Sequence, residues 1–319
     1  RESLDAPLVM EFRRCWRRRK ERFETPAATD RSLAPEWCLD CRLFCSFPVR
    51  GGVLADEIGY GKTALIIGLL DARHEAAVPS LPDTDEGFFF SSKATLICVP
   101  SNLHQQWVDE IVKFTGKKYR ILQLRTGMDM ARATVEDLAE ADIVVCNYQL
   151  LWGTAYEKRR EELVSKACPN KALTYEAIFG TAGKNVDELP LEDLRRGTWA
   201  FMRDPKCHPW ADLIKDSGAN GSTIPAWKNL RFPVLEQFFW RRIVFDEFHE
   251  LEALQFVQRA SLQYLRSHYR WGLTGTPALG AAQHVASMAS LLRVDVAGPI
   301  PDCKVSNAAH AAARPWAGD

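Results

Sequence analysis

The sequence predicts an α/β fold organised around a phosphate-binding loop. In the stretch 51–70, a short apolar strand leads through a glycine-bearing turn into an apolar helix. Further short apolar runs are typical of buried strands, namely 94–99, 119–124, 142–146 and 243–245. The last of these runs ends in an Asp-Glu pair, and parallel α/β proteins place their chemistry at the ends of such strands.

The stretch 51–70 carries the residue types that phosphate binding needs. Gly59 and Gly61 let consecutive backbone N–H groups curl round a phosphate, and the following helix adds a positive dipole end. Lys62 would reach the β- and γ-phosphates, and the Thr63 hydroxyl would ligate Mg²⁺. The general pattern wants glycine where this chain has Asp56, so the stretch by itself also fits a glycine turn before a core helix.

Composition narrows the class of protein. The chain has 319 residues, enough for one large α/β domain or two small ones. Lys+Arg and Asp+Glu both total 41, so affinity for nucleic acid must come from local patches. No apolar run approaches the length of a membrane span, and we expect no membrane partner. The chain starts at Arg1 without a signal-peptide pattern, and we expect it to be a piece of a longer protein.

Residues 1–50 are predicted to form a basic helix and a cysteine-containing lead-in. Apolar residues between 6 and 24 recur at a spacing that places them on one helical face, and the stretch 13–22 is rich in arginine. The basic face could meet nucleic acid, or it could be a solvated outer surface, as charge runs usually are.

The nine cysteines are scattered and are most simply interpreted as reduced thiols. Cys38, Cys41 and Cys45 have a spacing that could supply most of a zinc site, with Cys15 as one candidate for the fourth ligand. Because there is no second C-x-x-C pair, we do not expect the protein to bind zinc.

From 51 to 151 the predicted strands alternate with helices. Pro100-Ser101 ends the strand 94–99, and Asn147-Tyr148 follows the strand 142–146. The cysteine near the end of each of these strands is predicted to pack in the core. Helices are predicted over 63–77, 103–114 and 251–266.

From 152 to 235 the composition changes, and charged helical stretches alternate with Gly/Ser/Asn-rich pieces. We predict an insertion that is partly helical and partly flexible. The α/β core resumes over 236–296, where Trp271–Leu273 leads to Thr274-Gly275-Thr276-Pro277. Residues 297–319 are expected to form a flexible tail.

The carboxylates at the end of the strand 243–245 complete a nucleotide-hydrolysis site. Mg²⁺ needs an oxygen ligand opposite Thr63, and Asp246 suits that role. The attacking water needs a carboxylate to orient it and take its proton, which suits Glu247. A lone Asp-Glu pair often just follows a strand at the surface, but here a phosphate loop precedes it.

Five stretches, in order, resemble a known family. They are GGVLADEIGYGKT, LICVPSNLHQQWVDEI, VVCNYQLL, WRRIVFDEFHEL and RWGLTGTP. The set is similar to motifs I, Ia, Ib, II and III of the superfamily 2 helicases, specifically of the SWI/SNF-related DNA-dependent ATPases. In that family the first motif commonly reads like LADEMGLGKT, so Asp56 in place of glycine is expected. The resemblance covers about Gly51 to Pro277 apart from the insertion.

The resemblance implies a RecA-like P-loop lobe, with a mostly parallel sheet and helices on both faces. It implies ATP and Mg²⁺ as cofactors, double-stranded DNA and chromatin as partners, and a nuclear location. The nucleotide-binding positions would be Asp56, Gly59, Tyr60, Gly61, Lys62 and Thr63. The catalytic positions would be Lys62, Asp246 and Glu247, with Mg²⁺ on Thr63 and Asp246.

Further positions of the resemblance concern DNA. His249, Thr274 and Thr276 match residues that couple nucleotide state to the grip on DNA. Motifs that face the DNA backbone contain Pro100, Ser101, Asn147 and Tyr148.

Three departures from the family pattern stand out. The adenine-reading glutamine that precedes motif I is missing or lies before Arg1, since the first glutamine of this sequence is Gln105. Phe248 occupies a position that is often alanine and could alter packing. Nothing after Pro277 resembles motifs IV to VI, and the family's second lobe supplies the arginine that stabilises the transferring phosphoryl group.

We therefore expect one ATPase lobe of a double-stranded-DNA translocase of chromatin remodelling or DNA repair, nearly inactive without its second lobe. Two alternatives stay open. One is a different P-loop NTPase, against which Thr274–Pro277 and Asp246–His249 argue. The other is a non-hydrolysing scaffold fragment, against which the intact Lys62 and Glu247 argue.

Overall fold

A computed structural model describes the chain over 9–16, 37–44, 50–72, 77–81, 87–167, 189–214, 225–252, 254, 256–277 and 282–294. The chain divides into two compact units, Arg1–Val49 and Arg50–Asp319. The predicted tail, 297–319, lies outside the described residues.

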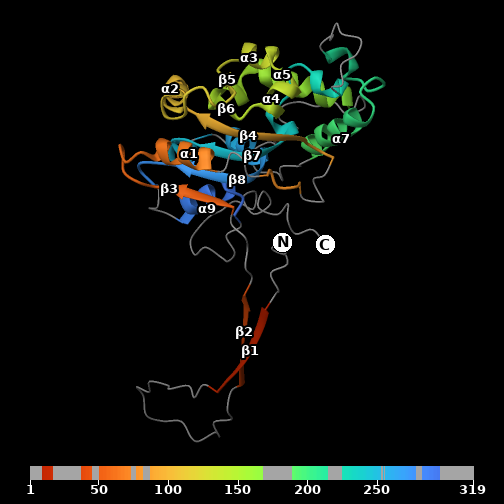
Figure 1. Ribbon diagram of the computed structural model, residues 1–319. Coiled ribbons are helices and arrows are strands. Elements are labelled where there is room, and N and C mark those ends of the chain that lie inside the picture. The colour runs from red at the N-terminus through yellow and green to blue at the C-terminus, as the bar shows by residue number, and fades with distance from the viewer. Residues whose placement is uncertain are drawn as a thin grey trace, which may run out of the picture. The chain divides into compact units, whose positions relative to one another are not determined.

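In the first unit, β1 (Val9–Trp16) pairs antiparallel with β2 (Trp37–Phe44) (Figure 1). The predicted basic helix is therefore wrong over Val9–Trp16, and residues 17–24 lie outside the described part. A local period cannot reveal a pairing partner that lies well downstream. The register places Cys15 opposite Cys38, and Cys45 is not among the described residues, so the expectation that zinc is not bound stays a prediction.

The second unit is built on a six-stranded sheet in the order β3-β8-β7-β4-β6-β5, in which every neighbouring pair is parallel. The strands are β3 (Gly51–Leu54), β4 (Phe90–Val99), β5 (Ile121–Leu124), β6 (Ile143–Asn147), β7 (Phe238–Phe245) and β8 (Arg266–Leu273). The predicted α/β class with a mostly parallel sheet is confirmed.

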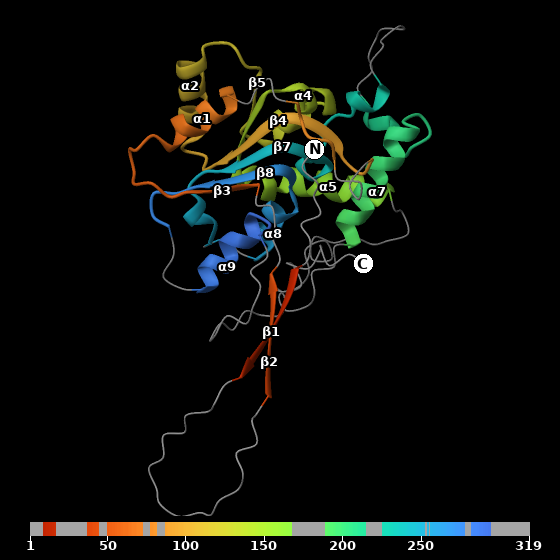
Figure 2. The same ribbon diagram turned by 60° about the horizontal axis from the view of Figure 1, so that its bottom comes forward.

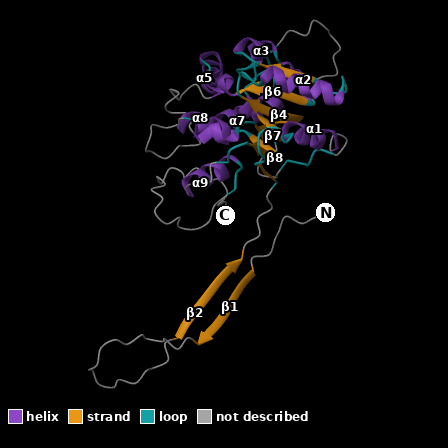
Figure 3. Cartoon of the chain, turned by 90° about the vertical axis from the view of Figure 1, so that its left-hand side faces the viewer, coloured by secondary structure: helices purple, strands orange, loops and turns teal. Residues whose placement is uncertain are grey.

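Helices cover both faces of the sheet. Figure 3 shows α1 (Lys62–Ala72) and α2 (His104–Thr115) on one side and most of the remaining helices on the other. The others are α3 (Gly127–Arg132), α4 (Val135–Glu140), α5 (Thr154–Ala167), α7 (Leu189–Arg203), α8 (Phe256–Tyr264) and α9 (Ala282–Leu291). Short 3₁₀ helices are η1 (Tyr148–Trp152), η2 (Ala211–Leu213), η3 (Ala226–Asn229), η4 (Leu235–Gln237) and η5 (Phe248–Glu252).

Each face of the sheet carries its own apolar cluster. In β4, Leu96 and Cys98 join the cluster under α4 and α5, while Ile97 and Val99 join the one under α1 and α2, because successive side chains of a strand point to opposite faces. The carboxyl-terminal parts of β4 and β7 are covered on both sides and are apolar, which is why the sequence revealed them. Cys98 and Cys146 are fully buried, so their predicted place in the core is confirmed.

The described part of the predicted insertion is well packed. Arg160 Nη1 lies 3.0 Å from Glu236 Oε1, and the two side chains are 0% and 1% exposed. The Tyr156 hydroxyl donates to the same carboxylate and accepts the Leu235 N–H at 2.7 Å. A buried ion pair of this kind needs such extra partners to offset its desolvation. The boundaries 152–235 stay a prediction.

The end of the unit differs most from the sequence prediction. Where a single helix 251–266 was expected, η5 is followed by the shorter α8, and β8 begins at Arg266. α8 lies beside α9 (Figure 2). Arg259 Nη1 of α8 donates to Ser287 Oγ of α9 at 2.7 Å. None of the helices among the described residues is long and apolar enough to cross a membrane.

Candidate functional site

The predicted site residues come from the carboxyl ends of three adjacent strands. β3, β8 and β7 are neighbours in the sheet, and they lead into Asp56–Thr63, Thr274 and Asp246 respectively. The Thr274 N–H donates to Leu54 O at 3.0 Å, which joins the ends of β8 and β3. The parallel sheet therefore brings together three segments that lie far apart in the sequence.

The loop between β3 and α1 has the backbone of a phosphate cradle. Gly59 and Gly61 have φ values of 90° and 77°, which side chains with a Cβ rarely adopt. Lys62 Nζ donates to the carbonyl oxygens of Asp56 and Glu57 at 2.7 and 2.9 Å. The Tyr60 side chain is 70% exposed. The ammonium group thus lies at the loop itself, bonded to main-chain oxygens that a phosphate oxygen could replace.

Asp246 is the buried acid of the site, at 9% exposure. Its Oδ2 accepts the Trp107 indole N–H at 2.6 Å, and its Oδ1 accepts the Glu247 N–H at 2.9 Å. Burial raises the pKa of the Asp246 carboxyl, while these two hydrogen bonds and the charge of Lys62 act to lower it. The Asp246 carbonyl accepts the Tyr148 hydroxyl at 2.8 Å.

Glu247 is more open, with 37% of its side chain exposed. Its φ of 47° is unusual for a residue with a Cβ, and such backbone outliers cluster at functional sites. Desolvation and the neighbouring charge of Asp246 raise the pKa of the Glu247 carboxyl. His249 Nδ1 lies 3.4 Å from Glu247 Oε2.

The loop lysine and the acidic pair belong to one site. The charge of Lys62 acts to lower the pKa of both Asp246 and Glu247, although desolvation is the larger effect on each. Because β3 and β7 also lie on either side of β8 in the sheet, the three groups belong to one cluster at the carboxyl ends of these strands. Their roles stay a prediction.

A chain of hydrogen bonds continues toward the end of β8. His249 Nδ1 lies 3.0 Å from Thr274 Oγ1, which accepts the Thr276 N–H at 3.1 Å. The three residues predicted to couple nucleotide state to DNA are therefore in contact with one another, and through His249 with Glu247.

The four residues predicted in DNA-facing motifs divide into two kinds. Ser101 is exposed and Pro100 half-buried, just before α2. Asn147 and Tyr148 are only 8% and 6% exposed. Asn147 Oδ1 lies 2.8 Å from His104 Nδ1, and its Nδ2 donates to Arg125 O at 3.0 Å. Both buried side chains therefore bond to neighbouring elements of the lobe.

Sequence reasoning missed two residues of this site, His104 and Trp107. Both lie on the face of α2 that points to the sheet, at 1% and 2% exposure. The helical period predicts that Trp107 packs as an apolar side chain. It gives no sign that the indole N–H donates a hydrogen bond. The signal was its position inside a motif-bearing stretch.

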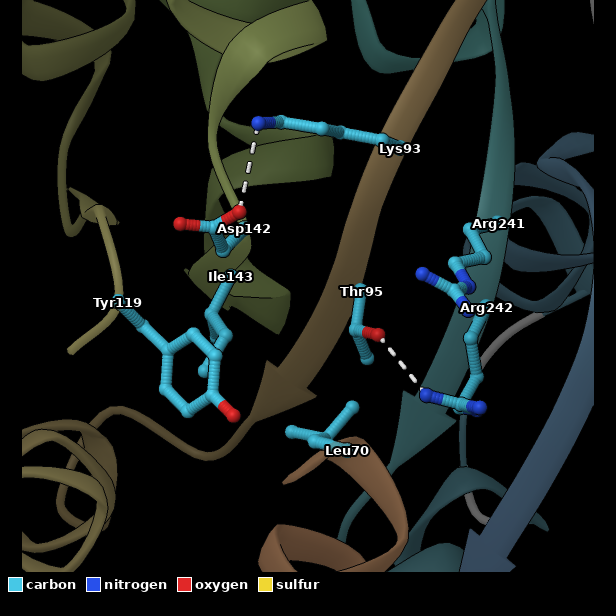
Figure 4. A pocket seen from close by; sticks show the side chains of 8 residues that line it. All are labelled: Leu70, Lys93, Thr95, Tyr119, Asp142, Ile143, Arg241 and Arg242. Carbon is cyan, nitrogen blue, oxygen red and sulfur yellow. Dashed lines mark hydrogen bonds and ion pairs between the residues drawn. The ribbon is translucent and has the colours of Figure 1, made fainter. Parts of the chain in front are cut away.

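A cavity of about 170 Å³ lies elsewhere on the sheet, near the first residue of β6 (Figure 4). Lys93 Nζ lies 3.4 Å from Asp142 Oδ1 at one side of it, and Arg242 Nη1 donates to Thr95 Oγ1 at 3.2 Å at the other. None of the residues that line this cavity belongs to the candidate nucleotide site, so the cavity is separate from that site.

Comparison with known families gives one match that spans most of the chain. The model of the SNF2-related domain matches residues 15–304. This range contains the phosphate loop, the acidic pair and the Thr274–Pro277 turn.

Curated relatives match over a similar range. The DNA (cytosine-5-)-methyltransferase DMT5 of Cryptococcus neoformans is 26% identical, over 77% of this chain and 13% of the relative. The DNA repair protein RAD5 of Candida albicans is 23% identical, over 77% of this chain and 17% of the relative. RAD5A of Arabidopsis thaliana is 24% identical, over 77% and 20%. The chain thus spans a fifth or less of these relatives.

Among solved structures, the Sulfolobus solfataricus SWI2/SNF2 ATPase core in complex with dsDNA is similar, at 17% identity and a TM-score of 0.38. The match covers 76% of this chain and 31% of that one.

Proposed function

Because the chain belongs to the SNF2-related domain family, a family of helicase-like ATPases, we propose that it is the ATP-binding and hydrolysing lobe of a double-stranded-DNA translocase. The observation that carries this proposal is that the neighbouring strands β3, β8 and β7 bring the Lys62 loop and the Asp246-Glu247 pair to one end of the sheet, where the Thr274 N–H donates to Leu54 O at 3.0 Å. A phosphate loop beside a buried and a more open carboxylate is the arrangement that nucleotide hydrolysis needs.

In this proposal each group of the cluster has one role. Lys62 exchanges its two carbonyl acceptors for the β- and γ-phosphates of ATP. The Thr63 hydroxyl and the Asp246 carboxylate hold Mg²⁺, and their oxygen atoms suit this hard cation. Bound Mg²⁺ would neutralise charge on the phosphates. Asp246 fits because its carboxylate has acceptor sites beyond those used by Trp107 and Glu247.

Glu247 is the proposed base that orients the attacking water. Desolvation and the neighbouring charge of Asp246 raise its pKa, which makes it a better proton acceptor than an ordinary carboxylate. His249, Thr274 and Thr276 form the hydrogen-bonded chain that would report nucleotide state to the DNA-facing segments.

The proposed partner is double-stranded DNA, in chromatin remodelling or DNA repair within the nucleus. The names of the relatives refer to DNA repair and to DNA methylation, and we extend that setting to this chain. Of the four predicted DNA-facing positions, Ser101 is the exposed one, just before α2.

We also propose that the complete catalytic site needs a second lobe. No stretch after Pro277 in this sequence resembles the later helicase motifs, and the family's second lobe supplies an arginine to the transferring phosphoryl group. The chain by itself is therefore expected to bind ATP weakly and to hydrolyse it poorly.

The test is ATP binding and turnover by the purified chain, with and without double-stranded DNA, beside Lys62→Ala. We expect the unchanged chain to bind ATP with negligible turnover. Lys62→Ala should abolish the binding, because the contacts of the ammonium group with both phosphates are lost. Strong DNA-stimulated turnover would contradict the need for a second lobe. Absence of any Lys62-dependent ATP binding would favour a scaffold instead.

A further inference from the structure

Asp246 is held by donors from two elements besides its own strand. Trp107 of α2 donates its indole N–H to Asp246 Oδ2 at 2.6 Å, and the Tyr148 hydroxyl at the start of η1 donates to Asp246 O at 2.8 Å. We propose that Trp107 and Tyr148 are positioning residues, which fix the orientation of the Asp246 carboxylate. We propose further that they connect it to the predicted DNA-facing segment at Pro100 and Ser101, called the DNA-facing edge below. This inference rests on the proposed function.

The bond from Trp107 leaves the carboxylate little freedom. An indole N–H can only donate, so it cannot exchange roles with the oxygen that it holds. Trp107 is 2% exposed and packs with Val99, Ile111 and Val244 in the cluster under α1 and α2. A donor fixed by packing transmits the position of its helix to the acceptor, and so the orientation of Oδ2 follows α2.

Tyr148 acts on the main chain of the same residue. It is 6% exposed, and its hydroxyl reaches the carbonyl that separates Asp246 from Glu247. The peptide between the two acids also carries the N–H that donates to Asp246 Oδ1. A shift of η1 would therefore tilt the peptide that positions both carboxylates.

The two elements that supply these donors are also joined to each other. His104 opens α2, and its Nδ1 lies 2.8 Å from Oδ1 of Asn147, the last residue before Tyr148. Pro100 and Ser101 lie directly before this junction. A contact with DNA at this edge would thus move α2 or η1, and it would reach Asp246 through the buried hydrogen bonds from Trp107 and Tyr148, without a long path through the lobe.

The expected consequence is in Mg²⁺ binding, since Mg²⁺ demands near-ideal octahedral geometry. Loss of the indole donor makes Oδ2 more basic, which favours the cation, but it also frees the carboxylate to rotate. We expect the loss of orientation to outweigh the gain in basicity, since a charge-assisted hydrogen bond is worth about tenfold in an equilibrium constant or more.

The experiment measures binding of a fluorescent ATP analogue to the full chain as Mg²⁺ is raised from an EDTA-treated start. Trp107→Phe should raise the Mg²⁺ concentration at half-saturation about tenfold. Its affinity for the nucleotide in EDTA should equal that of the unchanged chain, because Lys62 and the loop remain. Tyr148→Phe, which removes one oxygen, should raise the Mg²⁺ midpoint in the same direction by less.

Trp210→Phe is the matched control. Trp210 is fully buried, and its indole N–H donates to Leu163 O at 2.9 Å, so the same ring change is made away from Asp246. Its Mg²⁺ midpoint should stay at that of the unchanged chain. Equal midpoints for Trp107→Phe and the unchanged chain, or equal shifts in Trp107→Phe and Trp210→Phe, would overturn the positioning role.

Double-stranded DNA tests the connection to the edge. DNA should shift the Mg²⁺ midpoint of the unchanged chain, and Tyr148→Phe should reduce that shift. A full DNA-induced shift in both Trp107→Phe and Tyr148→Phe would overturn the connection. If Trp107→Phe does not fold, Tyr148→Phe decides the question alone. Failure of the unchanged chain to bind the analogue in a Lys62-dependent way would instead overturn the proposed function.

Discussion

Asp246 and Glu247 are adjacent in sequence but lie in different environments. The Asp246 carboxylate is buried and accepts two hydrogen bonds, from Trp107 and from the Glu247 N–H. Glu247 is more than a third exposed, and its left-handed backbone turns its side chain toward His249. One carboxylate is thereby fixed as a ligand would be, and the other stays accessible, as a base for water must be.

The raised pKa of Glu247 has a consequence for stability. Its pKa in the folded chain lies above the usual carboxyl value of about 4.3, so the native state binds the proton more readily than the unfolded chain. Ionisation of Glu247 therefore costs folding free energy, and stability falls as pH rises through the range just above that value. Glu247→Gln should melt at a higher temperature than the unchanged chain at pH 7.5.

The difference in melting temperature should close as pH falls to about 3, roughly one unit below the usual carboxyl value, where the glutamate is protonated in both states. Thermal unfolding of the two chains across pH measures it. A lower melting temperature for Glu247→Gln at every pH would contradict the argument.

At the scale of elements, Phe248 and Gly272 form a complementary pair. Phe248, which stands where the resembling family often has alanine, is 1% exposed and stacks on Phe245 with ring centroids 6.1 Å apart. A Cβ at Gly272 of β8 would lie 2.7 Å from the Phe248 ring. The larger side chain at one position is thus accommodated by the absence of a side chain at the other.

Gly272→Ala should therefore destabilise the unit by about 1–3 kcal/mol, because the added methyl group overpacks a closed site. Urea unfolding measures the change. Gly52→Ala on the neighbouring β3 is the control, since the nearest atom to its Cβ would be at an ordinary 3.7 Å. Adding Phe248→Leu to Gly272→Ala should recover part of the loss, and simple additivity of the two changes would contradict the pairing.

The same strand shows why sequence reasoning fails where buried positions are charged. In β8 the alternate buried residues include Arg266, His268 and Arg270, at 6%, 6% and 3% exposure. Desolvation, with Arg50 and Arg241 nearby, lowers the pKa of His268 to about 4. A hydropathy pattern identifies buried strands by apolar residues, so it did not identify β8 and extended a helix into Arg266.

At the scale of the whole molecule, the unit Arg50–Asp319 contains the entire parallel sheet and both apolar clusters. A chain that begins at Arg50 should therefore fold, since the β1–β2 pair belongs to the other unit. Its melting temperature should stay within about 3 °C of the full chain, equivalent to roughly 1 kcal/mol. Loss of soluble protein or of Lys62-dependent ATP binding would contradict this.

The sequence by itself determined the α/β class and the family, and it predicted the nucleotide-site positions. Each depends on short contiguous patterns, because a glycine turn before Lys62-Thr63 and an acidic pair after an apolar strand are local in the chain. The elements with clear apolar periods, such as β4 and α2, were predicted for the same reason.

Only the tertiary structure decided what depends on distant partners. It replaced the expected helix at Val9–Trp16 with a strand, since strand pairing depends on residues 37–44. It showed that Trp107, apolar by its period, donates to a carboxylate 139 positions away. It also showed that the Asn147 and Tyr148 side chains donate hydrogen bonds to main-chain carbonyl oxygens within the lobe. Hydrogen bonds between distant segments leave no periodic trace in a sequence, because either partner taken alone looks like ordinary packing.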